Sequence, residues 1–304
     1  MSDRVAAVDC GTNSIRLLIA DLADGELREV DRRMTIVRLG QGVDATGSFA
    51  PEALERVFRA SDEFAEVIRV AGVVRTRFVA TSAARDVRNR DEFFAGIRAR
   101  FGVDPEIISG AEEAELSFRG ATAGLATLAV PGPYLVADIG GGSTELVLGD
   151  ADGVIAAQSL DLGSVRLTER HVRSDPTAPD ELDAIAKDVD ALLDTTTVPL
   201  AEARALIGVA GTVTTVAAVA LGLPEYDRIA VHHARLGRTD LRAATTWLSE
   251  AFSVCSSGAA AVTSIDCDTS PNSRVMSTRA IAATSMVMPS RVVRLNPGFS
   301  AKIL

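Results

Sequence analysis

Two short segments of the chain combine an aspartate with glycine and hydroxyl residues in an order that suits phosphate binding. They are Asp9-Cys-Gly-Thr-Asn-Ser14 and Asp138-Ile-Gly-Gly-Gly-Ser-Thr-Glu145. Glycine lets the main chain approach an anion closely, so that successive N–H groups can converge on phosphate oxygens. The residues that we expect to contact phosphate are Gly11, Thr12, Asn13 and Ser14 in the first segment and Gly140, Gly141, Gly142, Ser143 and Thr144 in the second.

Carboxylates at the ends of these segments favour a divalent cation beside the phosphate. A turn between Asp138 and Glu145 would bring both side chains to one side, and Asp9 has the place of Asp138 in the first segment. Oxygen ligands next to phosphate favour Mg²⁺ or Mn²⁺. We therefore predict a metal site of Asp138, Glu145 and Asp9, although an aspartate that only caps a turn is the simpler interpretation of Asp138 alone.

Glu112 and Glu113 begin a predicted helix, where acids are favoured by the helix dipole in any case. Their functional interpretation is that one of them is a general base that activates water. Arg85 follows the predicted strand at 77–80, where its guanidinium could offset developing negative charge, and a solvated surface arginine is the equally simple alternative.

The segment Gly163-Ser-Val-Arg166 leads into another predicted helix. Helical N–H groups and the charge of Arg166 predict a second anion site there. Arg170, His171 and Arg173 follow, but a basic helix face of this kind is usually only solvated.

The two Asp-Gly segments lie in longer regions that align with a constant shift of 129 residues, from Asp9 on Asp138 to Asp21 on Asp150. This pattern indicates an internal duplication. Strand-like and helical patterns alternate in both halves, which is typical of an α/β fold. At 304 residues the chain is long for one core, so we predict two domains, residues 1–125 and 126–304, the latter with an atypical tail at 253–304.

The composition narrows the function. A net charge of −10 argues against a general nucleic-acid binder, because affinity for a nucleic-acid backbone comes from clustered Lys and Arg. The apolar runs are too short to span a bilayer, and Met1-Ser-Asp-Arg4 does not resemble a targeting leader, so we expect a cytoplasmic protein without a membrane partner. The oligomeric state stays open, with a homodimer as one option.

Five motifs in order resemble the exopolyphosphatase and guanosine pentaphosphate phosphohydrolase family. Besides the two loops they are Ala80-Thr-Ser-Ala-Ala-Arg85, Ile108-Ser-Gly-Ala-Glu-Glu-Ala114 and Gly163-Ser-Val-Arg-Leu-Thr-Glu169. The resemblance implies two actin-like, ribonuclease H-like domains, each a mixed sheet flanked by helices, around an interdomain cleft. It also implies hydrolysis of the terminal phosphoanhydride of polyphosphate or guanosine pentaphosphate with Mg²⁺. Carried over by motif, Glu113 is the general base, Asp138 and Glu145 hold the metal, and Arg85 contacts phosphate.

Short polyphosphate is our preferred substrate, because a long polyanion would be repelled by the acidic chain. The alternatives are guanosine pentaphosphate as substrate, an ATP-dependent phosphotransferase, and a binding protein that has lost turnover. The region Gly208–Thr215 resembles the adenosine site of kinases in the same superfamily. The tail after Phe252 departs from the family pattern, and a reading-frame shift is our hypothesis for it.

Overall fold

The computed structural model describes residues 3–85, 87–125, 130–175, 177–254 and 300–303. The chain divides into two compact units, Met1–Ser109 and Gly110–Leu304, and each unit contains one mixed sheet. The prediction of an α/β chain with two sheets flanked by helices is therefore confirmed. Among the described residues no helix has the length and apolar character that a membrane span needs.

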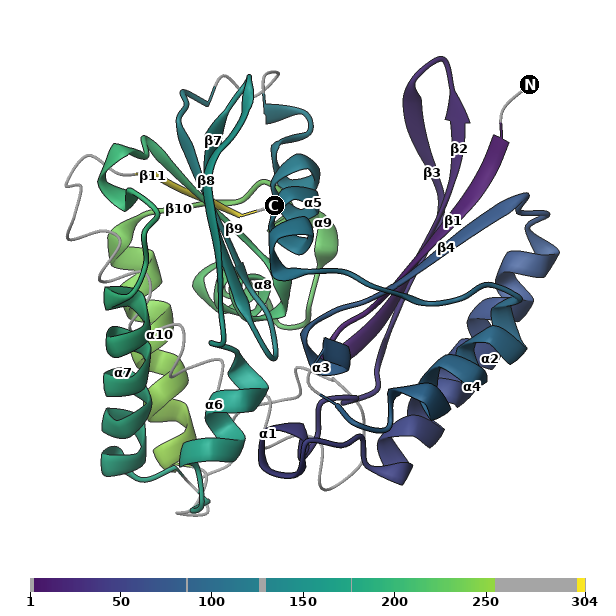
Figure 1. The fold of residues 1–304 in the computed structure, drawn as a ribbon. Coiled ribbons are helices and arrows are strands. Elements are labelled where there is room, and N and C mark those ends of the chain that lie inside the picture. The colour runs from purple at the N-terminus through teal and green to yellow at the C-terminus, as the bar shows by residue number, and fades with distance from the viewer. Residues whose placement is uncertain (1–2, 86, 126–129, 176, 255–299, 304) are drawn as a thin grey trace. The chain divides into compact units, whose positions relative to one another are not determined.

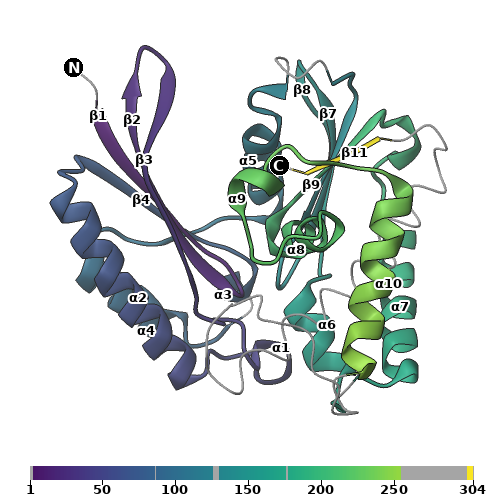
Figure 2. The same cartoon turned by 180° about the vertical axis from the view of Figure 1, so that it is seen from behind.

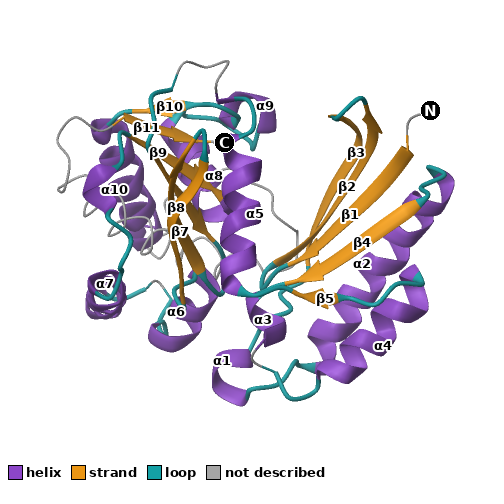
Figure 3. Ribbon diagram, turned by 45° about the horizontal axis from the view of Figure 1, so that its top comes forward, coloured by secondary structure: helices purple, strands orange, loops and turns teal. Residues whose placement is uncertain are grey.

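The first unit is built on a five-stranded sheet of order β3-β2-β1-β4-β5 (Figure 1). Its strands are β1 (Asp3–Cys10), β2 (Ser14–Ala23), β3 (Glu26–Ile36), β4 (Arg75–Ala80) and β5 (Glu106–Ile107). Its helices are α1 (Val43–Thr46), α2 (Pro51–Val70), α3 (Ser82–Arg85) and α4 (Arg90–Phe101). Figure 3 shows α2 and α4 along the same side of this sheet.

Local sequence explains where the long helices of this unit begin and end. Pro51 is the first helical residue of α2, where its missing N–H costs nothing. Gly102 ends α4 with a φ of 69°, a left-handed conformation that glycine adopts without strain. The core between sheet and helices includes Val8, Phe64 and Phe93.

The second unit is built on a six-stranded sheet of order β10-β11-β9-β6-β7-β8. Its strands are β6 (Tyr134–Ile139), β7 (Thr144–Asp150), β8 (Gly153–Leu160), β9 (Ala205–Val209), β10 (Arg235–Leu236) and β11 (Ser300–Ile303). Its helices are α5 (Gly110–Thr122), α6 (Ser164–His171), α7 (Pro179–Asp194), the 3₁₀ helix η2 (Leu200–Glu202), α8 (Ala210–Ala220), α9 (Arg228–Val231) and α10 (Arg238–Val254).

Helices cover both faces of the second sheet. Figure 1 and Figure 2 show α5 on one face and α7 with α10 on the other. Two separate apolar clusters match this arrangement, since Phe118 of α5 packs with Val136 and Ile207, whereas Val189 of α7 and Leu248 of α10 belong to the other cluster. Strands β6, β7 and β9 are buried from both sides, and the loop after β6 starts from this buried part of the sheet.

The internal duplication that the sequence predicts is visible in the strand order. In both units the first strand pairs antiparallel with the second, the second pairs antiparallel with the third, and the fourth lies parallel to the first on its other side. The ladder is irregular between Ile19 and Ala20 in one sheet and between Leu148 and Gly149 in the other. The two irregularities are displaced by the same 129 residues as the loops, so the alignment holds in the backbone.

The boundary between the units falls at 109/110 and not at the predicted 125/126, because α5 packs on the second sheet. Ala114, Phe118 and Ala121 of α5 belong to a cluster with strand residues of that sheet. A Cβ at Gly149 would lie 2.5 Å from the Phe118 ring, so this glycine makes room for the helix. Most of the predicted atypical tail, residues 255–299, lies outside the described part of the chain, and residues 300–303 form β11 between β9 and β10.

Candidate active site

The loop that joins β6 to β7 is a tight turn with a carboxylate on each side. The register places Asp138 directly opposite Glu145, as the sequence predicts, so both side chains lie on the same face of the sheet. The N–H of Gly140 donates to the Ser143 carbonyl over 3.0 Å and closes the turn. The first unit repeats this bond between Gly11 N–H and the Ser14 carbonyl, 2.9 Å long.

Helix α6 braces this loop from one side. The N–H groups of Val165 and Arg166 donate to the Gly141 carbonyl over 2.9 and 3.2 Å, and that of Ser164 donates to the Gly140 carbonyl over 3.0 Å. The Arg166 Nε donates to the Gly142 carbonyl over 3.0 Å. In a planar trans peptide the N–H points opposite to the carbonyl, so the N–H groups that follow these carbonyls point away from α6.

These hydrogen bonds between α6 and the β6–β7 loop contradict one prediction from the sequence. We expected the N–H groups at the start of the helix after Gly163 to bind an anion, but those of Ser164, Val165 and Arg166 are used by the loop carbonyls. Gly163 permits this close approach, because a Cβ there would lie 2.3 Å from the Gly141 carbonyl carbon. The start of α6 therefore shapes the β6–β7 loop, and for this segment only anion binding by the Arg166 side chain stays a prediction.

Two hydroxyl groups of the loop are already engaged in hydrogen bonds. Thr144 is fully buried, and its hydroxyl donates to the Leu162 carbonyl over 2.6 Å. A hydroxyl has one proton to donate, so the expectation that Thr144 adds a side-chain donor for phosphate is wrong. The Ser143 hydroxyl bonds Glu145 and so holds the adjacent carboxylate.

Three acids interact beside the loop. Glu145 is 1% exposed, and burial raises its pKa to about 8, with further contributions from the charges of Glu113 and Asp138. The Ser159 hydroxyl acts against this rise, because it donates to Glu145 over 2.8 Å. The Ser117 hydroxyl donates to the neighbouring acid Asp138 over 2.6 Å. The cluster concentrates negative charge in a place where solvent screens it poorly.

Of the two acids at the start of α5, Glu113 is the one whose charge raises the pKa of Glu145. Glu112 is exposed, whereas Glu113 is half-buried. The start of this helix is fixed against β8, because a Cβ at Gly110 would lie 2.6 Å from the Cβ of Ser159. The geometry therefore separates the two positions that the sequence pattern alone does not.

The residues present fit a hard divalent cation. No group of three or more His, Cys, Asp and Glu side chains that could hold a metal is found in the described ranges. Mg²⁺ is usually bound through one or two carboxylates together with water and substrate phosphates, so a complete protein cage is not required. The opposed carboxylates of Asp138 and Glu145, with the raised pKa of the latter, form a donor set that a cation would stabilise.

In the first unit, the corresponding loop is held by its own neighbours. The Thr12 and Ser82 hydroxyls lie 2.8 Å apart and are buried, so the Thr12 side chain supports α3. The Asn13 carbonyl accepts from the N–H groups of Val37 and Arg38 over 3.0 and 2.9 Å. Arg85, at the end of α3, donates to the Ile108 carbonyl over 3.0 Å.

Asp9 differs from its counterpart in the second unit. The register places Arg16 opposite Asp9, where the second unit has Glu145 opposite Asp138. The first hairpin thus pairs an acid with a base, and the second pairs two acids. The predicted role of Asp9 as a metal ligand stays a prediction.

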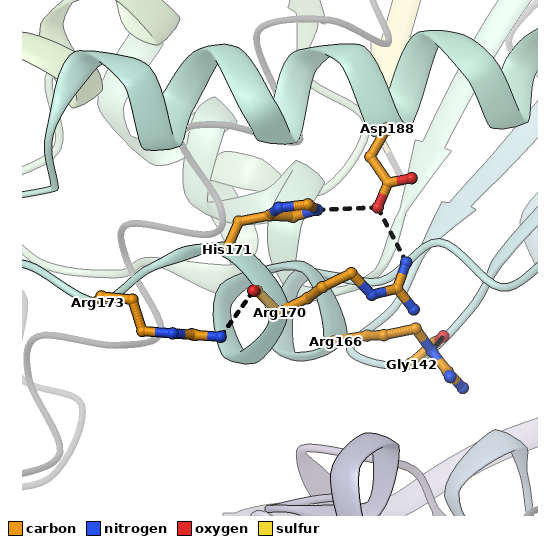
Figure 4. A network of polar contacts seen from close by, with 6 residues as sticks. All are labelled: Gly142, Arg166, Arg170, His171, Arg173 and Asp188. Atoms are coloured by element: carbon orange, nitrogen blue, oxygen red, sulfur yellow. Dashed lines mark hydrogen bonds and ion pairs between the residues drawn. The ribbon is translucent and has the colours of Figure 1, made fainter.

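Sequence reasoning missed Ser117, Ser159 and Asp188. The two serines look like ordinary helix and strand residues, and their importance comes from register and packing that no short motif encodes. Asp188 of α7 accepts from Arg170 and from His171 of α6, each over 2.9 Å (Figure 4). Burial alone would raise the pKa of Asp188, but the hydrogen bonds and charges of these two partners outweigh it and lower the pKa.

A model of the Ppx/GppA phosphatase family matches residues 18–251. The chain is 52% identical to Exopolyphosphatase 2 of Mycobacterium tuberculosis over 249 residues, which are 78% of this chain and 77% of the relative. The crystal structure of an exopolyphosphatase-like protein is similar with a TM-score of 0.88 and 40% identity, and covers 99% of this chain and 92% of the other. An exopolyphosphatase from Cytophaga hutchinsonii is similar with a TM-score of 0.79 and 26% identity, over 99% and 93% of the chains.

Proposed function

Because the chain belongs to the Ppx/GppA phosphatase family, we propose that it is an exopolyphosphatase, which hydrolyses the terminal phosphoanhydride bond of inorganic polyphosphate and releases orthophosphate. One observation carries the proposal for this site. The opposed pair Asp138 and Glu145 lies at the base of a glycine loop, with Glu113 close enough for its charge to act on the pair.

The β6–β7 loop is the proposed binding site for a phosphate group. Its carbonyls at Gly140, Gly141 and Gly142 are engaged by α6, so the N–H groups that follow them are directed to the other side. Converging N–H groups of this kind form a concave anion site without any charged side chain. We propose that the terminal phosphate group of the substrate binds there and that its oxygens accept hydrogen bonds from these N–H groups.

Asp138 and Glu145 are the proposed ligands of Mg²⁺, with Mn²⁺ as a substitute. The cation would offset the charge of the phosphate oxygens and lower the energy of the transition state as charge develops on them. Ser117 and Ser159 hold the two carboxylates in place through their hydroxyl groups. The role of Asp9 as a ligand stays a prediction from its aligned position in the duplicated hairpin.

Glu113 is the proposed general base. It accepts a proton from a water molecule, and the water oxygen forms a bond to the terminal phosphorus. The bond from that phosphorus to the bridging oxygen then breaks, and the electron pair leaves with the shortened chain. The contact of Arg85 with phosphate stays a prediction from its sequence motif; in the structure its guanidinium donates to the Ile108 carbonyl.

Orthophosphate release from short polyphosphate, long polyphosphate, guanosine pentaphosphate and ATP, with and without Mg²⁺, tests the proposal. We expect Mg²⁺-dependent release from polyphosphate, faster from short chains because the protein carries a net charge of −10. Glu113→Gln should lower kcat by about 10²–10⁴-fold, as loss of a general base typically does.

Glu112→Gln is the matched control, since it removes the same charge from the exposed neighbour on the same helix turn. It should keep kcat within about 2-fold, in line with a surface substitution. Equal losses in the two variants would remove Glu113 from the role of base. Turnover of guanosine pentaphosphate alone, or transfer of phosphate to an acceptor other than water, would replace the proposed activity.

A further inference from the structure

Each acid of the opposed pair Asp138 and Glu145 is bonded by a serine from a different element. Ser117 of α5 donates to Oδ2 of Asp138 over 2.6 Å, and Ser159 of β8 donates to Oε1 of Glu145 over 2.8 Å. A hydroxyl group has a single proton to donate, so each serine commits its proton to one carboxylate oxygen. One oxygen of each carboxylate is therefore tied to a neutral group of the protein.

The register of the sheet and the period of the helix bring these groups together. Asp138 lies opposite Glu145, and Glu145 lies opposite Ser159, so the three side chains form a row across β6, β7 and β8 on one face of the sheet. Ser117 follows Glu113 by four residues on α5, which places both on the same side of that helix. The serine that bonds Asp138 thus comes from the helix face that also carries the proposed general base.

The duplicated hairpin of the first unit provides an internal comparison. There the corresponding row across β1, β2 and β3 consists of Asp9, Arg16 and Met34. By register Met34 has the place that Ser159 has in the second unit, and a methionine side chain has no proton to donate. The serine is thus found in the row that contains two acids, and a methionine takes its place in the row that contains an acid and a base.

Hydrogen bonds to a buried carboxylate restrain its orientation. Glu145 is 1% exposed and also accepts a hydrogen bond from the Ser143 hydroxyl, so rotation of its carboxylate would break bonds that solvent is too remote to replace. The bond from Ser117 restrains Asp138 in the same way. Both proposed metal ligands are thus restrained by hydroxyl groups of the protein itself.

The freedom of the ligands is one property that separates Mg²⁺ sites from Ca²⁺ sites. Mg²⁺ requires octahedral geometry with oxygens at about 2.0–2.1 Å and keeps several water molecules, so that one or two carboxylates suffice. Ca²⁺ takes about six to eight oxygens at about 2.3–2.6 Å in a flexible geometry, in which a carboxylate can contribute both of its oxygens. A carboxylate with one oxygen committed to a hydroxyl group, and with little freedom to turn, therefore suits Mg²⁺ better than Ca²⁺.

We propose that Ser117 and Ser159 are positioning residues that make the pair Asp138 and Glu145 select Mg²⁺ over Ca²⁺. The inference rests on the proposed function and adds to it the choice of the cation. The two serines act through the acids and contact neither the substrate nor the cation. Hydrogen-bond partners of metal ligands typically account for about 10–100-fold in metal affinity, so the effect of each serine is measurable.

Binding of Mn²⁺, Mg²⁺ and Ca²⁺ to the full chain, without substrate, tests the proposal. The electron paramagnetic resonance signal of free Mn²⁺ gives the Kd of Mn²⁺, and displacement of bound Mn²⁺ gives the Kd of each of the other two ions. Ser117→Ala should weaken Mg²⁺ binding by about 10-fold and Ca²⁺ binding by less than about 2-fold, and Ser159→Ala should do the same. In activity assays both variants should need more Mg²⁺ for half-maximal release of orthophosphate, at an unchanged KM for polyphosphate.

Two further variants of α5 separate the role of the hydroxyl group from a change in the helix. Ser117→Thr keeps a hydroxyl group on the same carbon and should restore most of the Mg²⁺ affinity. Thr122→Val removes a hydroxyl group that donates to the Phe118 carbonyl of the same helix over 2.8 Å, so it should bind both ions as the parent does. Each variant is first shown to keep the parent's melting temperature within a few degrees, and Ser159→Ala carries the test if Ser117→Ala does not fold.

Equal weakening of Mg²⁺ and Ca²⁺ in the serine variants would overturn the selection, because the serines would then only support the acid pair. So would unchanged Mg²⁺ binding, a Ser117→Thr variant as weak as Ser117→Ala, or a parent that does not prefer Mg²⁺. A parent that prefers Mg²⁺ but releases no orthophosphate from polyphosphate would refute the proposed activity instead. The binding data would still decide the role of the serines in that case, because they need no turnover.

Discussion

Replacing Glu145 by glutamine should stabilise the fold at neutral and alkaline pH while it removes activity. The side chain is 1% exposed, and burial together with the charges of Glu113 and Asp138 raises its pKa to about 8 from an ordinary 4.5. Glutamine has the same shape and can still accept the Ser159 hydrogen bond, but it carries no charge at any pH. The substitution therefore isolates the free energy of holding an ionisable group in this place.

The sign follows from proton linkage. The folded protein binds the Glu145 proton more tightly than the unfolded chain does, so the contribution of this group to stability is greatest below pH 4.5 and is lost as the pH rises toward 8. Above pH 8 the loss levels off at about 5 kcal/mol, and at pH 7 it is about 3 kcal/mol, at 1.36 kcal/mol for each pH unit between the two pKa values. Glu145→Gln lacks this loss.

Thermal unfolding without divalent cations at pH 5, 6, 7 and 8 measures the effect. For a unit of this size we expect Glu145→Gln to melt about 10 °C above the parent at pH 8, with a difference that shrinks toward pH 5. Glu112→Gln removes an exposed acid from the helix that carries Glu113 and should show no such trend. Mg²⁺ should raise the melting temperature of the parent at pH 8 and not that of Glu145→Gln. A variant no more stable than the parent at pH 8, or a difference independent of pH, would refute the reasoning.

Two other predictions concern the metal and the contact between α6 and the β6–β7 loop. Mg²⁺ affinity should rise about 10-fold per pH unit between pH 6 and 8, because Glu145 must lose a proton to bind it, and calorimetry in two buffers of different ionisation enthalpy would count that proton. Gly163→Ala places a Cβ 2.3 Å from the Gly141 carbonyl carbon and should cost about 1–3 kcal/mol of stability and more than about 10-fold in kcat/KM. Gly120→Ala, where a Cβ meets nothing within 4 Å in helix α5, should be neutral or slightly stabilising, and equal losses in the two alanine variants would contradict the brace.

The hairpins were predictable because they are local. In each hairpin an apolar strand ends in Asp, and a short glycine segment joins it to a second apolar strand. This pattern favours one register, in which Asp138 lies opposite Glu145, and the structure has that register. The signal of helix α2 is equally local, since a proline at its first residue and the apolar spacing behind it both favour a helix, and the helix ends at Val70. The duplication needed only a constant shift in the sequence, and the two irregular ladders repeat it.

The hydrogen bonds between α6 and the β6–β7 loop were not predictable, because their partners depend on tertiary packing. A glycine before a helix start usually leaves the first N–H groups open, and that general expectation failed at Gly163, where the loop from another part of the sequence takes them. The Thr144 hydroxyl was misjudged for a similar reason, since only the position of Leu162 shows where it donates. The assignment of α5 to the second unit depends on Phe118 and the space left by Gly149.

The duplicated hairpins share a backbone but differ in the residue that decides their chemistry. Both close with the same glycine N–H to serine carbonyl bond, and both carry an aspartate at the end of the first strand. Opposite that aspartate stands Arg16 in one and Glu145 in the other. Two opposed acids repel each other and gain from a cation, whereas an acid opposite a base has no such repulsion. A duplicated hairpin can therefore become asymmetric through a single position, and the second hairpin is the one whose electrostatics suit the proposed metal-assisted hydrolysis.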